Sequence, residues 1–462
     1  MELDMTKGNP LHLILNFLFP VFLGNMFQQF YNMADTVIVG RFVGTTALAA
    51  VGSVGTIMFL VIGSAMGLTN GFTILTAQSL GAKDMARVKH SVTNGVLLTG
   101  VFTIALTVLS TTLMPNILHL MNTPEDIYKE AYTYIFIICM GMGASLYYNL
   151  GASYMRAIGN SKTPLYFLIF SAGINVVLDL LLIIVFHMGV AGAALATVIS
   201  QGMSAILCFV YIYKKIDILR PERSDWYFSK ADTKHQLHVG IPMALQYGIT
   251  ASGGMIMQSA INMFGSTAVA SFTAATKVQG LFNQGLMALV PSIATYSGQN
   301  FGKGDYKRVQ EGVKAGVEIS VVYGIAAAIL VNMFSKPLLG IFFPAGTDIN
   351  EVLPYARTYL TMATAFYIPL GCLLVFRNTM QGCGYGILPM LGGVIEFFAR
   401  MGTAVLAMHV GSYTIAVACD PATWFAAFMY TGITCWLIMR KLMPRDKRGK
   451  ATHRRRISVM HY

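Results

Sequence analysis

Acidic side chains inside apolar stretches are the residues of this chain most suited to chemistry. Only Asp35, Asp179 and Glu396 fall well inside stretches long enough to cross a membrane. An ionised carboxylate at membrane depth is costly unless it is paired or hydrated, so such residues mark functional sites by default. We therefore interpret each of the three as part of a site for an ion or for a charged substrate.

A polar stripe leads to Asp35 along the first apolar stretch. Its members are three or four positions apart and share one helical face: Asn25, Gln28, Asn32 and Asp35. Such a face is not suited to lipid, and Tyr31 lies beside it. We expect Gln28, Tyr31 and Asn32 to line a substrate cavity. The alternative is a polar seam that only packs this helix against its neighbours, with Asp35 as a helix cap.

Asp179 has partners at helical spacing. Asn175 lies four residues earlier on the same face. The next turn is near Met188, with Asp179 nine residues before it and Thr197 nine after it, so both lie about 13 Å from that turn. Because Asp35 is also in the outer half, we predict that Asp35, Asn175, Asp179 and Thr197 form a hard-oxygen site for Na⁺ or, with one acid protonated, for H⁺. The alternative for Asp179 is a satisfied pair in the core.

The second half of the chain offers a different polar set. Glu396 and Arg400 are four residues apart, in the order that favours an ion pair within one helix. Lys277 lies mid-stretch and is another possible partner. We expect Lys277, Glu396 and Arg400 to form a polar cluster whose role is structural pairing; substrate binding or proton relay is the alternative.

Composition sets the class of protein. Of 462 residues, 55% are hydrophobic and 11% are charged, against about 25% charged in soluble domains. This composition excludes a soluble enzyme and indicates a multi-pass membrane protein. The six cysteines form no CxxC or metal-binding spacing, and we expect no cofactor. Much of the +12 net charge lies after residue 440, in a tail that we interpret as an inner anchor rather than a nucleic-acid site.

The elements that must position these residues are twelve helices. The predicted spans are 11–38, 45–77, 91–114, 131–155, 164–187, 190–213, 237–263, 267–297, 316–339, 354–381, 387–409 and 413–440. With the N-terminus inside, the inner segments hold 25 Lys and Arg residues and the outer loops hold four. This asymmetry predicts a multi-pass protein of the inner (plasma) membrane with both termini cytoplasmic. The first span lacks the features of a cleaved signal peptide.

The chain also repeats itself. Matching segments recur at offsets of 221 and 225 residues: GTTALAA and GSTAVAS, AQSLGAKDMARV and GQNFGKGDYKRV, RAIGNSKTP and QGCGYGILP. Two pseudo-symmetric six-helix bundles around a central cleft follow, because an even number of spans gives both repeats the same orientation. We assign an N-lobe (1–213), a cytoplasmic linker (214–236), a C-lobe (237–440) and a basic cytoplasmic tail (441–462).

Several of these segments resemble one transporter family. QQFYNMADTVIVGRFVGTTALAAVG, the repeated AQSLGAKD and GQNFGKGD, RAIGNSKTP, and INVVLDLLLI followed by GAALAT are similar to the multidrug and toxic compound extrusion (MATE) family. The resemblance is to the bacterial branch related to the DNA-damage-inducible proteins. In that branch the N-lobe ion site has an acid in helix 1, an Asn and an Asp in helix 5 and a Thr in helix 6. These positions correspond to Asp35, Asn175, Asp179 and Thr197.

The resemblance implies a function. We expect a secondary active antiporter that exports organic, often cationic and aromatic, compounds in exchange for Na⁺ or H⁺ by alternating access. Its partners would be small molecules and membrane lipids, without nucleic acid, and it would act as a monomer. One alternative is a flippase for lipid-linked oligosaccharides or peptidoglycan precursors, which would need several cations in the cleft; a channel or sensor is another. The sister branch also has acids in helices 7 and 10, which this chain lacks there.

Overall fold

The structure is a computed structural model that describes residues 3–121, 123–340 and 349–443. These residues form helices joined by short turns, and no strand occurs among them. The all-α fold is therefore as predicted. The predicted basic tail lies almost wholly outside the described residues.

The N-lobe contains the helices before the linker. In chain order they are α1 (Pro10–Phe42), α2 (Thr45–Ser53), α3 (Gly55–Gly81), α4 (Met85–Leu120), α5 (Glu125–Met140), α6 (Met142–Ala157), α7 (Lys162–Leu180), the π-helical turn η1 (Leu181–Val185) and α8 (Gly189–Lys215). The linker holds two short 3₁₀ turns, η2 (Asp217–Leu219) and η3 (Arg223–Asp225).

The C-lobe repeats this order. Its helices are α9 (Lys230–Asn262), α10 (Ser266–Met287), α11 (Leu289–Lys303), α12 (Tyr306–Met333), α13 (Ser335–Gly340), α14 (Ile349–Ala365), α15 (Tyr367–Gly382), α16 (Ile387–Val410), α17 (Tyr413–Val417) and α18 (Cys419–Leu442). Helix α9 begins seven residues before the predicted span at 237, because Ser229 caps it and accepts a hydrogen bond from the Asp232 amide.

The repeated motif has a local physical cause. Asp84 and Asp305 are equivalent N-cap residues, each accepting a hydrogen bond from the backbone N–H three residues later, in α4 and α12. The pairs α5–α6 and α14–α15 are also equivalent, since they bend by 48° and 46°. The two halves therefore share capping and bending as well as sequence.

Fewer helices are clearly long and apolar enough to cross a membrane than the twelve spans that we predict. In the described chain there are eight such helices, or up to ten if each bent pair counts as one span. The two predicted spans left out are α9 and the α10–α11 pair, which are helical but more polar. Helix α9 packs along α3 of the other lobe, and α10 contacts α1, so these helices have faces that do not meet lipid.

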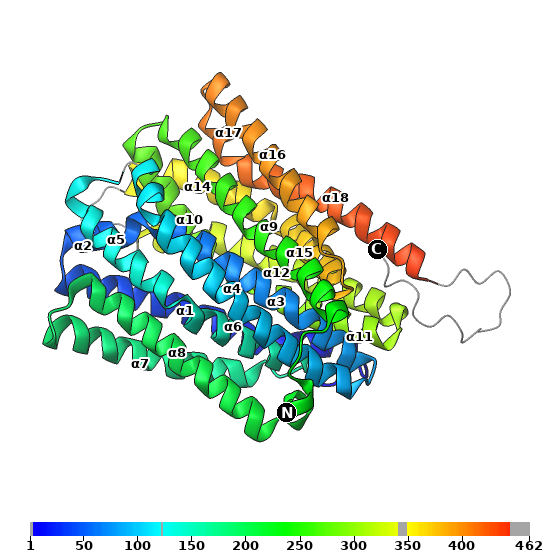
Figure 1. The fold of residues 1–462 in the computed structure, drawn as a ribbon. Coiled ribbons are helices and arrows are strands. Elements are labelled where there is room, and N and C mark those ends of the chain that lie inside the picture. Colours follow the sequence, from blue (N-terminus) through cyan, green and yellow to red (C-terminus); the bar gives the residue numbers. More distant parts are fainter. Residues whose placement is uncertain (1–2, 122, 341–348, 444–462) are drawn as a thin grey trace.

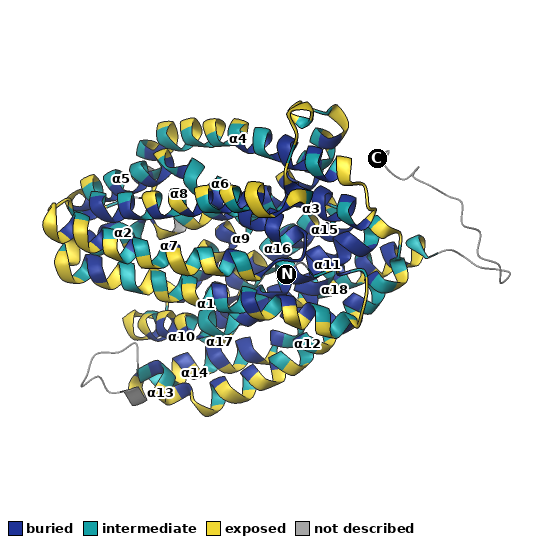
Figure 2. Cartoon of the chain, turned by 90° about the horizontal axis from the view of Figure 1, so that it is seen from below, coloured by how far each residue is buried: buried dark blue, intermediate teal, exposed yellow. Residues whose placement is uncertain are grey.

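The two lobes pack closely at one end of the molecule. Buried residues gather where α3, α9, α11 and α15 meet (Figure 2). The N-terminus, the α3–α4 turn and the last turn of α18 lie at this end, which the charge distribution predicts to be the inner one (Figure 1). In the outer half of the N-lobe, the hydrophobic core around Ile38, Ala131 and Ile135 contains only N-lobe residues.

Candidate functional site: the N-lobe acids and the seam between the lobes

Helix α1 belongs to both lobes. Its inner part contributes Ile14 and Phe17 to the hydrophobic core of the C-lobe, and its outer part packs against α7 and α8 of the N-lobe. Pro20 is buried between these parts, where it removes one backbone hydrogen bond from the helix. Tyr31 and Asp35 lie on the outer part, so their positions depend on how α1 joins the two lobes.

The carboxyl groups of Asp35 and Asp179 face each other. They are close enough to form one side-chain hydrogen bond when either is protonated. When both are ionised, Oδ1 of Asp35 and both carboxylate oxygens of Asp179 have no donor among the described residues. Asp179 is fully buried on α7, one residue before that helix ends and η1 begins. Among the described residues, no basic side chain is paired with either acid.

Polar groups from other helices complete this cluster. Asn175 is fully buried on α7, and neither its Oδ1 nor its Nδ2 has a hydrogen-bond partner among the described residues. The hydroxyls of Tyr31 and Thr197 lie 3.4 Å apart, joining α1 to α8. The Tyr31 hydroxyl also interacts electrostatically with both acids. The structure therefore brings Asp35, Asn175, Asp179, Thr197 and Tyr31 into one region.

Tyr134 of α5 is a member of this cluster that the sequence analysis missed. It is buried, and its hydroxyl interacts with Asp35, Asp179 and Tyr31. No polar stripe on α5 marked it, because an aromatic residue on an apolar helix is usually part of the core. The cluster therefore spans four helices: α1, α5, α7 and α8.

This arrangement can hold a small cation. Two carboxylates, an amide oxygen and a hydroxyl are ligands suited to Na⁺, and two facing carboxyls can instead share a proton. In the described chain no group of three or more His, Cys, Asp or Glu side chains is arranged to hold a metal ion. An ion here would therefore depend on Asn175 and Thr197 as well as on the acids.

The predicted substrate residues differ in their surroundings. Asn32 is exposed and Gln28 is half-buried on α1, whereas the hydroxyl of Tyr31 lies near that of Thr197, among the residues around the two acids. The Asn25 side chain donates a 3.5 Å hydrogen bond to the Gln284 carbonyl of α10. Tyr31 thus belongs with the acids, and the inner end of the polar stripe touches the C-lobe.

The predicted ion pair between Glu396 and Arg400 is wrong. Glu396 of α16 pairs with Arg377 of α15, and Arg400 pairs instead with Asp420 of α18 at 2.8 Å. The Asp420 carboxylate also accepts a 3.1 Å hydrogen bond from Tyr359. Pairing between helices is preferred because Glu396 and Arg400 are both buried on α16, so that each side chain meets a partner on a neighbouring helix.

Lys277 does not join that cluster. It is exposed on α10, and no ion pair to it is present in the described part of the chain. The sequence analysis did not single out Asp420, although this residue lies seven positions inside the predicted span at 413–440. Its position inside a predicted span was the signal that could have found it.

The inner ends of the lobes are joined by a symmetrical contact that we call the inner gate, formed by Gln78, Gly81, Gln299 and Gly302 with the ends of α6 and α15. The Gln78 amide donates a 2.8 Å hydrogen bond to the Gly382 carbonyl, and the Gln299 amide donates one of the same length to the Ala157 carbonyl. These are equivalent positions of the two repeats. The repeated motif therefore builds two copies of one contact across the seam.

Glycine is required at the inner gate. A Cβ on Gly81 would lie 1.8 Å from the Gln299 carbonyl oxygen, and one on Gly302 would lie 1.9 Å from the Gln78 carbonyl oxygen. Both distances are far below van der Waals contact. The equal spacing of Gln and Gly in the two repeats is thus explained by close approach of the backbones of α3 and α11.

Comparison with known proteins agrees with this architecture. The sequence profile of the MatE family matches residues 20–181 and 242–408. The probable multidrug resistance protein YpnP of Bacillus subtilis (strain 168) is 28% identical over 444 residues, covering 95% of this chain and 98% of that protein. A protein of Shewanella oneidensis named FAD transporter is 23% identical, covering 93% of this chain and 94% of its own.

A solved structure has the same fold. It is described as the outward-facing conformation of a multidrug resistance MATE family transporter of the MOP superfamily, and it aligns with a TM-score of 0.88 at 19% identity, covering 95% of this chain and 98% of the other. The family match, the helical lobes and the apolar spans lead to one conclusion. The chain belongs to the MATE family and is a multi-pass membrane transporter, not an enzyme.

Proposed function

We propose that this transporter is a secondary active antiporter that exports organic compounds in exchange for Na⁺ or H⁺. The observation that carries this proposal is the pair of facing acids, Asp35 and Asp179, which have no cation partner inside the N-lobe. Two unpaired carboxylates are unfavourable in a buried site, and a bound Na⁺ or a shared proton removes the repulsion. The multidrug resistance names of its relatives support efflux as the direction of transport.

The proposed coupling runs through α1. Ion binding draws the outer part of α1, with Asp35 and Tyr31, toward α7 and α8, while the inner part stays with the C-lobe core. Pro20 lies between the two parts and allows them to bend relative to each other. Ion and substrate then need no direct contact, because each only has to bind the two packings of the lobes with different affinity.

The proposed membrane orientation follows from the same features. With both termini in the cytoplasm of a bacterial cell, the inner gate faces the cytoplasm and the described conformation is closed inward. The protein would act as a monomer, since each chain carries both lobes and the whole seam. The flippase alternative has little support, because Arg377 and Arg400 are already paired with acids inside the C-lobe.

The test is efflux from proteoliposomes that contain the purified protein. Ethidium export is measured under imposed Na⁺ or H⁺ gradients for the parent, Asp35→Asn and Asp179→Asn. A matched control is Asp217→Asn, which removes the same charge from a linker side chain that is 94% exposed. We expect the gradient-driven component to fall at least about tenfold in both N-lobe variants, corresponding to a coupling free energy in the usual range. Full gradient-driven export by both folded variants would refute the assignment.

A second candidate is export of anion-bearing compounds, and specific cations favour it. Lys277 and Arg156 have no carboxylate partner among the described residues, unlike Arg377 and Arg400. Arg156 is held by a 2.8 Å hydrogen bond to Ser153 and faces Tyr247 across the seam. Lys277 is seven residues from Gln284, which contacts Asn25 of α1, so it lies about 10 Å farther out on that helix.

Relatives support considering this second candidate, since one of them is named FAD transporter. The test compares export of FAD with export of ethidium by the parent, Lys277→Gln and Arg156→Gln. Selective loss of FAD export would favour an anionic substrate. Equal effects on both compounds, or no FAD export by the parent, would reject it.

A further inference from the structure

A groove opens on the molecular surface beside the seam between the lobes, at the start of α9. It has a volume of about 780 Å³ and lies between the first turns of α9 and the first residue of α16. Basic side chains line one part of it, namely Lys230, Lys234 and His238, and apolar side chains line the rest, including Phe228, Ile241 and Ile387. A ligand that fits this groove must therefore combine a negative charge with an apolar body.

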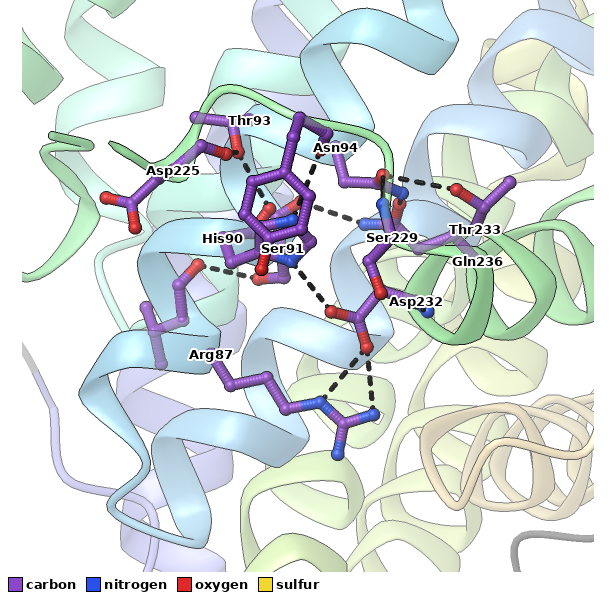
Figure 3. Close-up of polar contacts among 12 residues, drawn as sticks. Arg87, His90, Ser91, Thr93, Asn94, Asp225, Ser229, Asp232, Thr233 and Gln236 are labelled. Atoms are coloured by element: carbon purple, nitrogen blue, oxygen red, sulfur yellow. Dashed lines mark hydrogen bonds and ion pairs between the residues drawn. The ribbon is translucent and has the colours of Figure 1, made fainter. Parts of the chain in front are cut away.

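The acid in this turn does not neutralise the groove. Asp232 lies between the two lysines in the chain but points to the other side, where it binds Arg87 at 3.0 Å and His90 at 2.8 Å on α4 (Figure 3). Lys230 and Lys234 are both exposed, and neither forms an ion pair in the described ranges. The first turns of α9 thus present their acid to the protein interior and their lysines to the groove.

The inward contact fixes this turn firmly. Around Asp232, the Asn94 side chain donates a 2.7 Å hydrogen bond to Gln236, and the Gln236 amide donates to the Ser91 carbonyl at 2.9 Å (Figure 3). Because Asp232 and Gln236 are one turn apart and both buried, the opposite face of α9 has a set orientation. The backbone positions of Lys230 and Lys234 are therefore fixed, because the first turns of α9 cannot rotate about the helix axis.

The groove lies where a membrane surface would be. Farther along the same face of α9, Ile241 and Leu245 are 39% and 54% exposed, as expected of residues in contact with lipid tails. Before the helix, Trp226, Tyr227 and Phe228 are each at least half exposed. Aromatic residues of this kind are enriched at the interface between membrane and water. The basic end of the groove thus lies at headgroup depth and the apolar end at the depth of the acyl chains.

We propose that this groove binds an anionic phospholipid of the inner leaflet. The phosphate lies between Lys230 and Lys234, and an acyl chain lies along Ile241 and Ile387. The basic tail of this chain is not suited to the groove. It carries nine Lys and Arg and one acid after residue 439, so Lys230 and Lys234 would repel it. A soluble anion would gain nothing from the apolar walls, which make up the other part of the groove.

Such a lipid would stabilise the closed inner gate. The lipid would bind one face of the first turns of α9, and Asp232 and Gln236 hold the opposite face to α4. A bound molecule that prefers this arrangement raises its population in proportion to its differential affinity. This inference does not depend on which ion or substrate is transported.

The experiment measures lipid retention by native mass spectrometry of the full-length protein with added dioleoyl phosphatidylglycerol or dioleoyl phosphatidylcholine. The variant is Lys230→Gln/Lys234→Gln. The control is Lys162→Gln/Lys307→Gln, which removes two exposed lysines from the same end of the molecule. Glycerol 3-phosphate is added as a competitor to separate headgroup binding from lipid binding.

We expect phosphatidylglycerol to bind the parent and the control alike, and the variant about thirtyfold more weakly, because each lysine near an anionic lipid contributes about 1 kcal/mol. Lys230→Arg/Lys234→Arg should restore binding, and glycerol 3-phosphate should not compete. Equal binding of phosphatidylcholine, equal loss in the control, or unchanged binding in the variant would overturn the proposal. Thermal denaturation in phosphatidylcholine nanodiscs verifies that the variant is folded, so weak binding is not mistaken for unfolding.

Discussion

The two lobes have the same architecture but differ in whether their acidic side chains are paired with basic ones. In the N-lobe, Asp35 and Asp179 face each other, and no basic side chain among the described residues is paired with either. In the C-lobe, the buried acid Glu396 and the half-buried acid Asp420 are each paired with an arginine. Duplication thus preserved helices, bends and the inner gate, whereas the charged residues diverged. An acid that is paired with an arginine is already neutralised, whereas two unpaired acids can bind a cation or a proton.

The largest expected effect is a difference in stability between variants of the two lobes. Glu396→Gln leaves the buried guanidinium of Arg377 without its carboxylate, and removing one member of a buried pair costs about 3–5 kcal/mol. Asp179→Asn removes one of two repelling acids and should not destabilise the protein. The measurement is the thermal denaturation midpoint of both variants in the same detergent. A drop of similar size in both would show that the lobes do not differ in this way.

The second prediction concerns the symmetrical part of the molecule. Gly302→Ala places a methyl group against the Gln78 carbonyl and should cost the closed gate about 1–3 kcal/mol, the usual range for overpacking. Gly81→Ala should have a matching effect, because it occupies the equivalent place. Spin-label distances between the inner ends of the lobes measure the closed population. Gly173→Ala is the control, since its Cβ would meet no atom within 4 Å; unequal effects of the two gate variants would contradict the symmetry.

A third prediction concerns a histidine of α9 at the seam between the lobes. His235 lies just before the predicted span and beside Gly384, and burial, reinforced by Arg87, lowers its pKa to about 4 from 6.5. Between about pH 6.5 and 4 the unfolded chain binds this proton and the folded chain does not, so stability falls as the pH drops through this window.

The size of that pH effect should be about 1–2 kcal/mol, because partial exposure of the imidazole reduces the full linkage term. His235→Gln should flatten the fall in the denaturation midpoint between pH 6.5 and 4. The control His12→Gln, at an exposed position on α1, should leave it unchanged. An identical pH profile for the parent and His235→Gln would refute the prediction.

The smallest expected effect sharpens the description of the N-lobe site. Tyr31→Phe removes the hydroxyl that lies 3.4 Å from that of Thr197. One hydrogen bond contributes about 0.5–1.5 kcal/mol, so the concentration of Na⁺ or H⁺ for half-maximal transport should rise about two- to tenfold. Tyr359→Phe, which removes a hydroxyl bonded to Asp420 in the C-lobe, should leave that concentration unchanged. The reverse result would move the coupling site to the C-lobe.

Sequence by itself determined the fold class, the duplication and the location of the N-lobe acids. Helical spacing placed Asn175 and Asp179 on one face of α7, and equal distance from the turn near Met188 brought Thr197 to the same depth. These are short-range relations set by the 1.5 Å rise and the 3.6-residue turn of the helix. The repeated Gln and Gly residues were also visible, although their contact across the seam was not.

Tertiary structure alone decided which charges are paired. Glu396 and Arg400 have the spacing of an ion pair within a helix, yet each binds a residue from another helix. The free energy of a pair four residues apart on a helix is only about 0.2–0.5 kcal/mol, far less than the about 3–5 kcal/mol that it costs to leave a buried charge without its partner. Partner choice therefore depends on how α15, α16 and α18 pack, which helical periodicity does not encode.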